Sequence, residues 1–383
     1  MTDVVFLAGR DPFDEVSGGH SSYVRGYARA AMLAGFTPHI FCVGRSSETR
    51  ETEIGVLHRV TSPYRPFRQM LAALHARPLA AALARFAAGR RGPLLVHSFG
   101  VWGIAALGLP GAILIQSSYT TYREEALSHV RGATSPLVRL RFAALSWWVA
   151  AAVERWERRA YRAARVVLVN YESVARLVRQ RHGVNALVMP YAAESAFSDS
   201  PATPHTGNRI ISIARHEPRK GNDVLLRALS LLRVPFRARL IGGGPLLAQH
   251  RALAKELGLR DIVEGIVPDL RPLLDEADIF VLPSREEQSG SLAVLEALQS
   301  GLAIVATAVD GLLEDLGPED ALLVPPDDPA ALAAALTRVL TDRELRTRLQ
   351  SRARALFEKR FAAAPFAAAL GAIYRELMCA NAS

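Results

Sequence analysis

Short, continuously apolar runs alternate with helix-length segments along the first half of this 383-residue chain. Because these runs are apolar at consecutive rather than alternate positions, they are typical of strands buried on both faces of a parallel sheet. The segments between them, such as residues 21–35 and 174–183, supply the helical crossovers that parallel strands require. The runs are VVFLA (4–8), HIFCV (39–43), LLVHS (94–98), AILIQ (112–116) and RVVLVN (165–170). This pattern predicts a doubly wound α/β domain.

The pattern stops at residues 192–208, which are rich in Ser, Pro and Ala, and then begins again. From about Asp328 onward the chain is typical of helices, with a break near Pro365. The second series of apolar runs is RIISIA (209–214), ARLIGG (238–243), IFVLP (279–283), AIVAT (303–307) and ALLVP (321–325).

Two such series predict an α/β fold of two doubly wound Rossmann-like domains that face each other across a cleft. We expect an N-terminal, acceptor-binding domain over residues 1–194 and a linker over 195–208. A C-terminal, donor-binding domain would cover 209–360. The last helix, 361–383, would pack back on the N-terminal domain.

The composition of the chain indicates the cell compartment in which we expect it to function. Its start reaches Asp11 too early for a signal peptide. The longest nearly uncharged apolar run, residues 142–153, is shorter than the roughly 20 residues that cross a bilayer. Cys42 and Cys379 are far apart in the sequence, which indicates neither a disulfide framework nor a cysteine metal site. We expect a cytoplasmic protein with free thiols.

Positive charge is concentrated in the first half of the chain. Residues 1–194 hold 24 basic and 13 acidic residues, whereas residues 195–383 hold 22 basic and 24 acidic ones. The positive electrostatic potential of these residues would attract an acidic substrate, anionic lipid or nucleic acid. No zinc finger, RNP-type motif or lysine-rich tail accompanies it, so we expect no nucleic acid partner.

The segment 135–165 joins three tryptophans and an apolar stretch to flanking arginines. One interpretation is an interfacial helix that contacts an anionic membrane peripherally, at the inner face of the cell membrane. The other is a core helix whose tryptophans pack under the first sheet while its arginines extend outward. On the sequence alone we favour the core helix.

In the second half, ARHEPRKG places Arg215 just after a strand and Lys220 just before a helix. Two cations at the carboxyl end of a strand suit a diphosphate, which arginine can bind through two hydrogen bonds and lysine as a point charge. The alternative is that both are solvated loop charges in an arginine-rich chain. A glycine-rich turn, IGGG (241–244), is weak as a phosphate motif, because its spacing matches no nucleotide-binding pattern.

The stretch QSGSLAVLEALQSG predicts a helix that begins near Ser291. The free amides at its start, around Ser289, Gly290 and Ser291, together with the helix dipole, favour an anion such as a phosphate. Glu296, further along this helix, could accept hydrogen bonds from two ribose hydroxyls. The alternative is an exposed glutamate on the polar face.

Two features of the first half lie at expected strand ends. Gly18 and Gly19 follow the first strand, where they either admit a substrate close to the backbone or merely make a tight turn. His97 ends the strand LLVHS and is either catalytic or a structural residue with satisfied hydrogen bonds.

Seven segments in order resemble the family-4 retaining glycosyltransferases, which have the two-Rossmann GT-B fold. ARHEPRKG is similar to the G-R-L-x-x-x-K-G pattern of that family, and IGGGP to its I-G-D-G-P. ADIFVLPS and EALQSGLAIVAT are similar to A-D-I-F-V-L-P-S and E-A-M-A-x-G-x-P-V-V-A-T. Gly18-Gly19, VHSFG and NYESVARLVRQRHGV complete the set. The resemblance covers nearly the whole chain.

The resemblance implies a role for each segment. Arg215 and Lys220 would bind the donor diphosphate and stabilise its charge. Glu296 would hold the ribose, and the amides of Ser289 to Leu292 the phosphate and the sugar. Ile266 and Val267 would line the nucleobase pocket. No metal or other cofactor would be needed, since the two cations and the helix start take its place.

Two positions depart from the family pattern. Gln288 stands eight residues before Glu296, where the family has a glutamate that contacts donor-sugar hydroxyls. Gln116 stands where the family commonly has a histidine that faces the transferred sugar. Glutamine still binds hydroxyls, so we interpret both changes as tuning of the donor preference. Glu286 and Glu287 are out of register with the family glutamate.

These features together predict a retaining glycosyltransferase that uses a nucleotide-diphosphate sugar, with UDP-sugars favoured and GDP-sugars an option. Its acceptor could be a glycan, a lipid-linked sugar or a small molecule. The alternatives are a sugar-nucleotide 2-epimerase and a sugar-nucleotide-binding subunit without turnover. A sugar phosphorylase is disfavoured, because no lysine is placed like an anchor for pyridoxal phosphate.

Overall fold

The computed structural model describes residues 2–14, 19–62, 72–90, 92–124, 127, 140, 143–144, 147–148, 152–189, 191–197, 207–287 and 290–381. It divides into two compact units. Unit 1 comprises Met1–Phe197 and Ala362–Ser383, and unit 2 comprises Ser198–Phe361.

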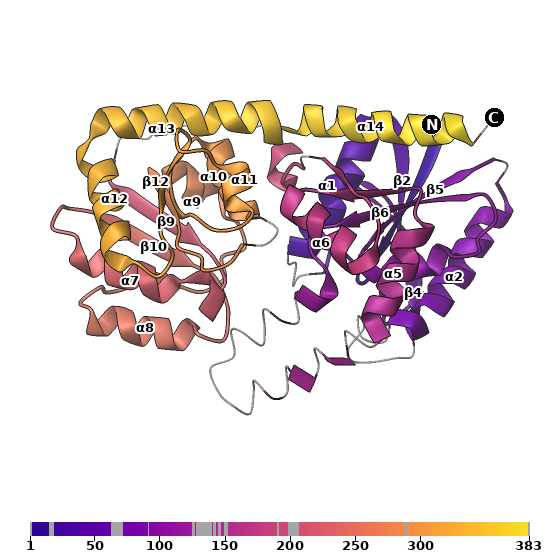
Figure 1. Cartoon of the computed structure of the whole chain (residues 1–383), viewed down its shortest axis with the longest axis horizontal. Helices are drawn as coiled ribbons and strands as arrows, with labels where there is room; N and C mark the ends of the chain where they lie inside the picture. Colours follow the sequence, from indigo (N-terminus) through magenta and orange to yellow (C-terminus); the bar gives the residue numbers. More distant parts are fainter. Residues whose placement is uncertain are drawn as a thin grey trace. The chain divides into compact units, whose positions relative to one another are not determined.

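Unit 1 is built on an eight-stranded sheet of order β3-β4-β2-β1-β5-β6-β7-β8 (Figure 1). All neighbouring strands pair in parallel except β3 and β4, which form an antiparallel hairpin at the edge. The strands are β1 (Thr2–Ala8), β2 (Phe36–Gly44), β3 (Glu48–Thr52), β4 (Gly55–Thr61), β5 (Leu94–Phe99), β6 (Ala112–Ser118), β7 (Val166–Val169) and β8 (Leu187–Val188). The helices are α1 (Gly19–Leu33), α2 (Ala72–Ala88), η1 (Gly100–Ala106), α5 (Glu154–Ala163), α6 (Glu172–His182) and η3 (Glu194–Phe197).

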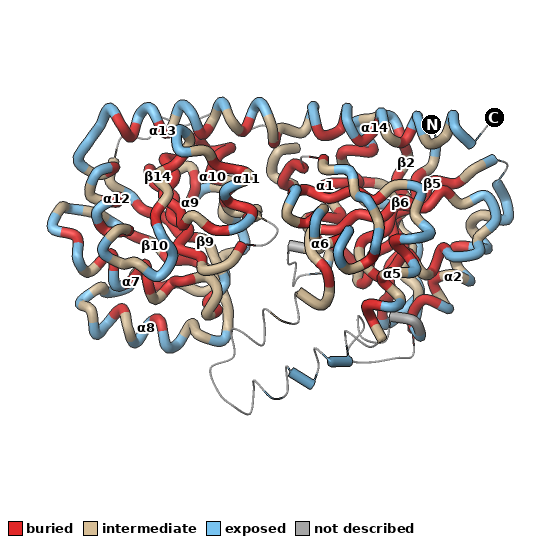
Figure 2. Tube along the Cα trace, in the orientation of Figure 1, coloured by how far each residue is buried: buried red, intermediate tan, exposed pale blue. Residues whose placement is uncertain are grey.

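The central strands of unit 1 are continuously buried, as their apolar sequences predict (Figure 2). Helix α14 (Ala363–Ala380) packs on α1 within the same unit. Its Phe366 meets Tyr27 with ring centroids 5.0 Å apart, and its Tyr374 meets Phe36 at 5.2 Å. The end of the chain therefore belongs to the core of unit 1.

Unit 2 holds a six-stranded, wholly parallel sheet of order β11-β10-β9-β12-β13-β14. Its strands are β9 (Arg209–Ile213), β10 (Arg237–Ile241), β11 (Val263–Glu264), β12 (Ile279–Leu282), β13 (Ala303–Thr307) and β14 (Ala321–Val324). Its helices are η4 (Pro218–Lys220), α7 (Asn222–Leu231), α8 (Leu247–Glu256), α9 (Arg271–Glu276), α10 (Leu292–Ser300), α11 (Leu312–Asp315), α12 (Pro329–Thr341) and α13 (Arg343–Leu356). A π-helical turn, η5 (Phe357–Phe361), follows α13.

The fold confirms the prediction of two doubly wound α/β domains. The break in the C-terminal helices lies at η5 and Ala362, shortly before Pro365. Pro365 itself lies in the first turn of α14, where a missing backbone N–H costs little. Hairpin β3–β4 and the two-residue strands β8 and β11 are additions to the predicted elements.

The segment 135–165 lies largely outside the described residues, apart from α5 and a few isolated positions. Among those positions, Trp147 is 72% exposed and Trp148 42% exposed. The favoured interpretation, in which the tryptophans of this segment pack under the first sheet, is therefore wrong for Trp147 and Trp148. Trp156 on α5 agrees with it, because this side chain packs against the hydrophobic core of unit 1. Among the described helices, none combines the length and the apolar character that crossing a bilayer requires.

Candidate functional site

The carboxyl end of β9 leads into the loop that carries both predicted cations of unit 2. Arg215 extends into solvent with 65% of its side chain exposed, and it pairs with Glu217 at 2.9 Å. Lys220, at the end of η4, is only 12% exposed and forms an ion pair with Glu287. Both side chains thus lie at the ligand-binding edge of a parallel sheet, one open to solvent and the other buried.

Burial lowers the pKa of Lys220, and the neighbouring carboxylate of Glu287 opposes this shift. A buried ion pair stabilises a fold little more than an apolar pair does. Removing one partner is costly, because it leaves an unpaired charge buried in the protein. A bound anion that displaces Glu287 would keep Lys220 paired. The arrangement is therefore suited to binding an anionic ligand at Lys220.

Glu287 is the residue that reasoning from the sequence missed. Its carboxylate is 3% exposed and accepts hydrogen bonds from Lys220 Nζ and from Ser284 Oγ at 2.7 Å. Its carbonyl accepts from the amides of Gly290 at 3.3 Å and Gly311 at 3.0 Å. Glu287 is out of register with the family glutamate in the sequence, yet it contacts Lys220, one of the predicted site residues.

The spacing explains why the sequence did not single out Glu287. Counting eight residues back from Glu296 selects Gln288 and assumes a loop of fixed length before α10. Counting forward from the end of β12 reaches the acidic pair Glu286 and Glu287, directly after Arg285. The structure places the second of these acids against Lys220.

Arg285 braces the loop that carries Lys220. Its guanidinium donates to Pro218 O at 2.5 Å and to both carboxylate oxygens of Asp223 at 2.9 Å, and it pairs with Asp327 at 2.6 Å. Its backbone amide donates to Arg219 O at 2.8 Å. Burial alone would raise the pKa of Asp223, but the hydrogen bonds and charge of Arg285 hold it below its usual value.

The glycine-rich turn after β10 packs directly on the Arg215 loop. A Cβ atom on Gly242 would lie 2.1 Å from Ala214 O, and one on Gly244 would lie 2.6 Å from His216 O. Both glycines also have positive φ angles, of 156° and 145°, so the close approach requires glycine there. On the other side, Ile266 contacts Gly243 and is 80% exposed.

Helix α10 begins at Leu292, one residue after the expected start. Its N-cap residue, Ser291, has an extended backbone and makes no capping hydrogen bond through its side chain. Gly290 precedes it with a φ of 68°, and Glu296 is half-buried one turn further along. The amide dipoles at the start of α10 favour an anion. Gln288 and Ser289 lie outside the described residues.

His97 in unit 1 is completely buried rather than presented to a ligand. Its ring nitrogens lie 2.6 Å from Tyr374 Oη and 2.6 Å from Ser117 Oγ, and burial lowers its pKa to about 3. This histidine connects β5 to α14, so the structural alternative fits the geometry. Gly19 is the first residue of α1, and Gly18 lies outside the described residues.

Gln116 is equally inaccessible. Its side-chain amide is completely buried and donates to Gly100 O at 2.5 Å. A side chain fully buried between β6 and η1 cannot face a sugar in this structure, which contradicts its expected sugar-facing position. Its burial follows from the position of β6 inside the sheet, where both faces are covered and nearly every side chain is buried.

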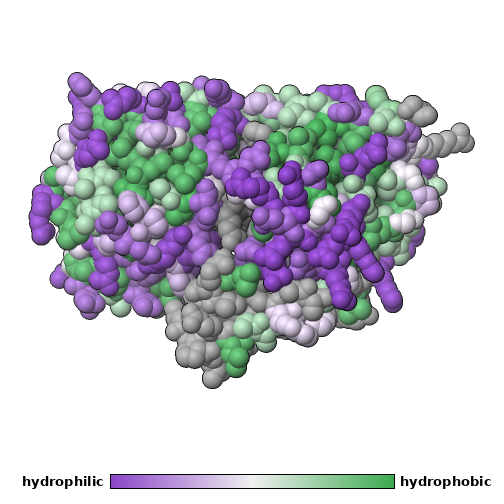
Figure 3. All heavy atoms as spheres, in the orientation of Figure 1, coloured by the Kyte–Doolittle hydropathy of each residue, from purple (hydrophilic) through white to green (hydrophobic). Residues whose placement is uncertain are grey.

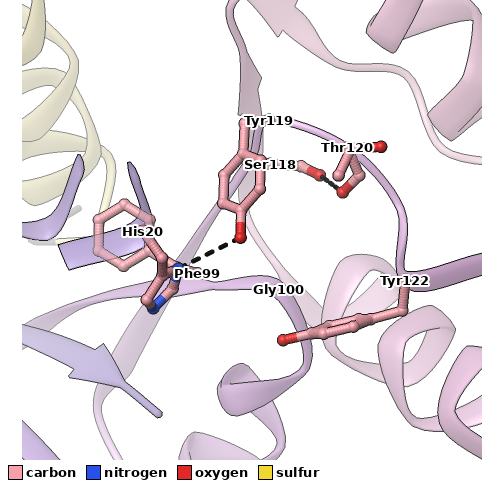
Figure 4. Close-up of a pocket in the computed structure, with 7 residues that line it drawn as sticks. All are labelled: His20, Phe99, Gly100, Ser118, Tyr119, Thr120 and Tyr122. Atoms are coloured by element: carbon pink, nitrogen blue, oxygen red, sulfur yellow. Dashed lines mark hydrogen bonds between the residues drawn. The ribbon is translucent and has the colours of Figure 1, made fainter. Parts of the chain in front are cut away.

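Next to these buried groups, the carboxyl ends of β5 and β6 and the first turn of α1 enclose a small pocket (Figure 4). It is lined by His20, Phe99, Gly100, Ser118, Tyr119, Thr120 and Tyr122. Unit 1 therefore has its own candidate ligand position at the sheet edge where parallel α/β folds bind ligands.

Comparison with solved structures shows the same fold over the whole chain. Sucrose-phosphate synthase from Thermosynechococcus elongatus superposes with a TM-score of 0.75, at 22% identity, over 99% of this chain and 100% of that chain. Anabaena HepE, solved in complex with UDP and glucose, has a TM-score of 0.68 at 16% identity, over 98% of this chain and 100% of that chain.

Sequence comparison points to the same group of proteins. The chain is 33% identical over 290 residues to MMP alpha-(1->4)-mannosyltransferase of Mycolicibacterium hassiacum, which covers 69% of this chain and 66% of that protein. It is 35% identical over 163 residues to D-inositol 3-phosphate glycosyltransferase of Jonesia denitrificans, covering 39% of this chain and 38% of that protein. The matched part is thus less than two thirds of each relative.

Family models match both halves of the chain. The model of glycosyltransferase family 4 matches residues 17–190, and the model of glycosyl transferases group 1 matches residues 207–342. With the motif order, the fold and these two matches in agreement, the chain belongs to the group 1/family 4 glycosyltransferases, which have the GT-B fold.

Proposed function

We propose that this chain is a retaining glycosyltransferase that moves a sugar from a nucleotide-diphosphate sugar to an acceptor hydroxyl. The observation that carries the proposal is the pair of cations at the carboxyl end of β9, beside the glycine-rich turn. Arg215 is open to solvent, and Lys220 is held by a carboxylate that an anion can replace. A diphosphate supplies two such anionic groups.

Each part of the donor then has a proposed position in unit 2. Arg215 and Lys220 bind the diphosphate, and the amides at Gly290, Ser291 and Leu292 bind its phosphate oxygens and the sugar. Glu296 accepts hydrogen bonds from the ribose hydroxyls. The nucleobase lies along Ile266 and Val267; the exposure of Ile266 beside Gly243 supports this position.

Glu287 gains a role once the diphosphate occupies Lys220. Its carboxylate, released from the lysine, can accept hydrogen bonds from hydroxyls of the donor sugar. Gln288 follows it directly in the sequence and would add amide donors and acceptors at the same loop. Donor-sugar preference would then depend on the pair Glu287 and Gln288 rather than on Gln288 alone.

The reaction needs no protein nucleophile. The bond between the sugar and the leaving phosphate oxygen breaks as the acceptor oxygen attacks from the same face. The departing phosphate oxygen takes the acceptor proton, and Arg215 and Lys220 stabilise the charge that develops on the diphosphate. These groups provide the positive charge that a metal ion supplies elsewhere.

A uridine nucleotide is the first choice of donor. HepE, which shares this fold, was solved with UDP and glucose, whereas the relative matched over 290 residues is named for mannosyl transfer. UDP-sugars and GDP-sugars are therefore the two donor classes to compare. The acceptor remains a glycan, a lipid-linked sugar or a small molecule.

A peripheral membrane contact of residues 135–165 is part of the proposal. The exposed rings of Trp147 and Trp148 support it, and Figure 3 shows hydrophilic side chains gathered over α5 and α6. Helix α5 alone carries four arginines: Arg155, Arg158, Arg159 and Arg162. Flotation with anionic vesicles should retain the protein at low salt and release it at high salt. Equal recovery with neutral vesicles would contradict the contact.

Turnover with a panel of nucleotide sugars tests the activity. UDP-glucose, UDP-galactose and GDP-mannose are incubated with the protein and a mixture of methyl glycosides, and products are followed by mass spectrometry. A new glycosidic bond with retained configuration supports the proposal. A changed donor sugar supports the 2-epimerase, and tight binding without turnover supports the non-catalytic subunit. In either of these cases the proposed transfer activity is wrong.

A further inference from the structure

The pocket of unit 1 brings together polar groups from three segments. His20 comes from the first turn of α1, Phe99 and Gly100 from the end of β5, and the remaining lining residues from the end of β6 and just beyond. Figure 4 shows the rings of Tyr119 and Tyr122 on two sides of the pocket, with His20 below the Tyr119 hydroxyl. The three groups therefore surround one small space.

The size of this space limits what can enter it. The space that the centre of a water-sized sphere can occupy in it is about 10 Å³, which is close to what a single water molecule needs. A whole sugar ring does not fit inside. A single hydroxyl group, projecting from a ligand that lies outside, does fit.

The lining selects for charge as well as size. None of the described lining residues carries an acidic, lysine or arginine side chain. His20 is kept neutral near pH 7, because burial and the nearby Arg10 lower its pKa to about 4. No cation of the lining can thus pair with a phosphate or a carboxylate, which disfavours both in so small a site.

His20 has one ring nitrogen without a partner. Its Nδ1 lies 3.4 Å from Tyr119 Oη, while its Nε2 is buried and has no hydrogen-bond partner among the described residues. If the tyrosine donates to Nδ1, then Nε2 carries the proton and needs an acceptor. In the other tautomer Nε2 needs a donor. A hydroxyl group satisfies either tautomer, whereas an anion satisfies only one.

We infer that this pocket is a specificity site for one uncharged hydroxyl of the saccharide acceptor, held by His20, Tyr119 and Tyr122. The inference rests on the proposed transferase function, because it assigns the acceptor to a class within that function. It places a neutral, hydroxylated part of the acceptor against unit 1. Charged parts of the acceptor, such as a lipid phosphate, bind elsewhere.

The test uses the full chain with tyrosine rings labelled with ¹³C. Tyr119→Phe and Tyr122→Phe assign the two ring signals and remove one hydroxyl each. Methyl α-glycosides of glucose, galactose and mannose are the neutral probes, and mannose 6-phosphate is the charged probe. Tyr374→Phe is the matched control, since it removes a buried phenol hydroxyl of unit 1 outside the pocket.

We expect at least one neutral glycoside to shift the Tyr119 and Tyr122 signals in a saturable way. Each pocket variant, and His20→Ala, should weaken that binding at least fivefold, while Tyr374→Phe changes it less than twofold. Binding of mannose 6-phosphate should be weaker than that of the neutral mannoside.

Two results would overturn the inference. One is the absence of saturable shifts with any neutral glycoside, and the other is tighter binding of the phosphorylated sugar at the same two tyrosines. UDP is titrated into the same samples as a separate readout, because its proposed site lies in unit 2. If the wild-type protein binds no UDP while a neutral glycoside still shifts both tyrosine signals, the donor proposal is contradicted and the pocket assignment stands.

Discussion

At the scale of single residues, the ion pair between Lys220 and Glu287 is the most informative feature of unit 2. Both side chains are nearly buried, so each depends on the other for compensation of its charge. Glu287→Gln should destabilise the ligand-free protein by about 3 kcal/mol, the order expected when a buried pair loses one partner. The lysine is then fully available to a diphosphate.

We therefore expect Glu287→Gln to change how strongly UDP raises the Tm of the protein. The rise in Tm caused by saturating UDP should be larger for Glu287→Gln than for the wild type, while sugar transfer falls. Glu286→Gln is the control and should leave both quantities close to those of the wild type. An equal or smaller rise in Tm for Glu287→Gln would mean that the diphosphate does not compete for Lys220.

The buried His97 should make the folding stability of unit 1 depend on pH. Its pKa is about 3 in the fold, against about 6.5 in an unfolded chain. Between these values the unfolded state binds more protons, so stability falls as the pH falls from about 6.5 towards 3. The slope for one such histidine is about 1.4 kcal/mol per pH unit.

Urea unfolding at a series of pH values checks this contribution. His97→Asn should be less stable at pH 7.5, because it loses the contact with Tyr374, but should lose stability less steeply below pH 6.5. A slope unchanged by the substitution would show that His97 is already protonated in the fold.

Residue types at strand ends predicted where Arg215 and Lys220 lie, just after β9 and just before α7. Glu287 and Arg285 could not be predicted in the same way. Their roles depend on partners far along the chain, such as Lys220 for Glu287 and Asp223 for Arg285. For His97 the sequence left two alternatives open, because the residues that bury it, such as Tyr374 of α14, lie far along the chain.

At the scale of elements, the loop between β9 and α7 is held from β12 by Arg285. Arg285→Met removes the bonds to Pro218 and Asp223 and should loosen the segment that carries Lys220. We expect UDP affinity to fall about tenfold, which corresponds to about 1.4 kcal/mol. Calorimetric titration of UDP measures this change.

Two further variants distinguish loss of the contact between Arg285 and Asp223 from loss of a charge in general. Asp223→Asn should reproduce much of the effect, and the double variant should be no worse than Arg285→Met, since both remove the same interaction. Asp327→Asn removes a partner that is 59% exposed and should cost little. Additive effects of Arg285→Met and Asp223→Asn would contradict the brace.

The continuous apolar runs predicted the strands of four residues or more in both sheets, except β3 and β4, because burial on both faces leaves a strong signal. Hairpin β3–β4 was missed, since β3 (ETRET) is an edge strand with a polar sequence. Strand β11 has only two residues, too few to show any periodicity. What the sequence could not supply was the set of contacts between loops, which decides the site.

At the scale of the whole molecule, the chain folds as two units, and its last helix returns to the first of them. The N-terminal unit contributes a pocket without charged side chains, and the C-terminal unit contributes a pair of cations beside a helix start. This division of charge agrees with a donor that carries a diphosphate and an acceptor that offers a hydroxyl. It also separates the tests, because each ligand reports on one unit.

The central claim is that a nucleoside diphosphate binds at the cationic edge of unit 2. Titration calorimetry of UDP, GDP and ADP into the wild type and into Lys220→Met, Glu296→Ala and Lys255→Met tests it most directly. The account predicts that at least one nucleotide binds. Its affinity should drop at least tenfold with Lys220→Met and with Glu296→Ala, and stay unchanged with Lys255→Met. Binding of none of the three nucleotides, or equal affinity in all four proteins, would contradict it.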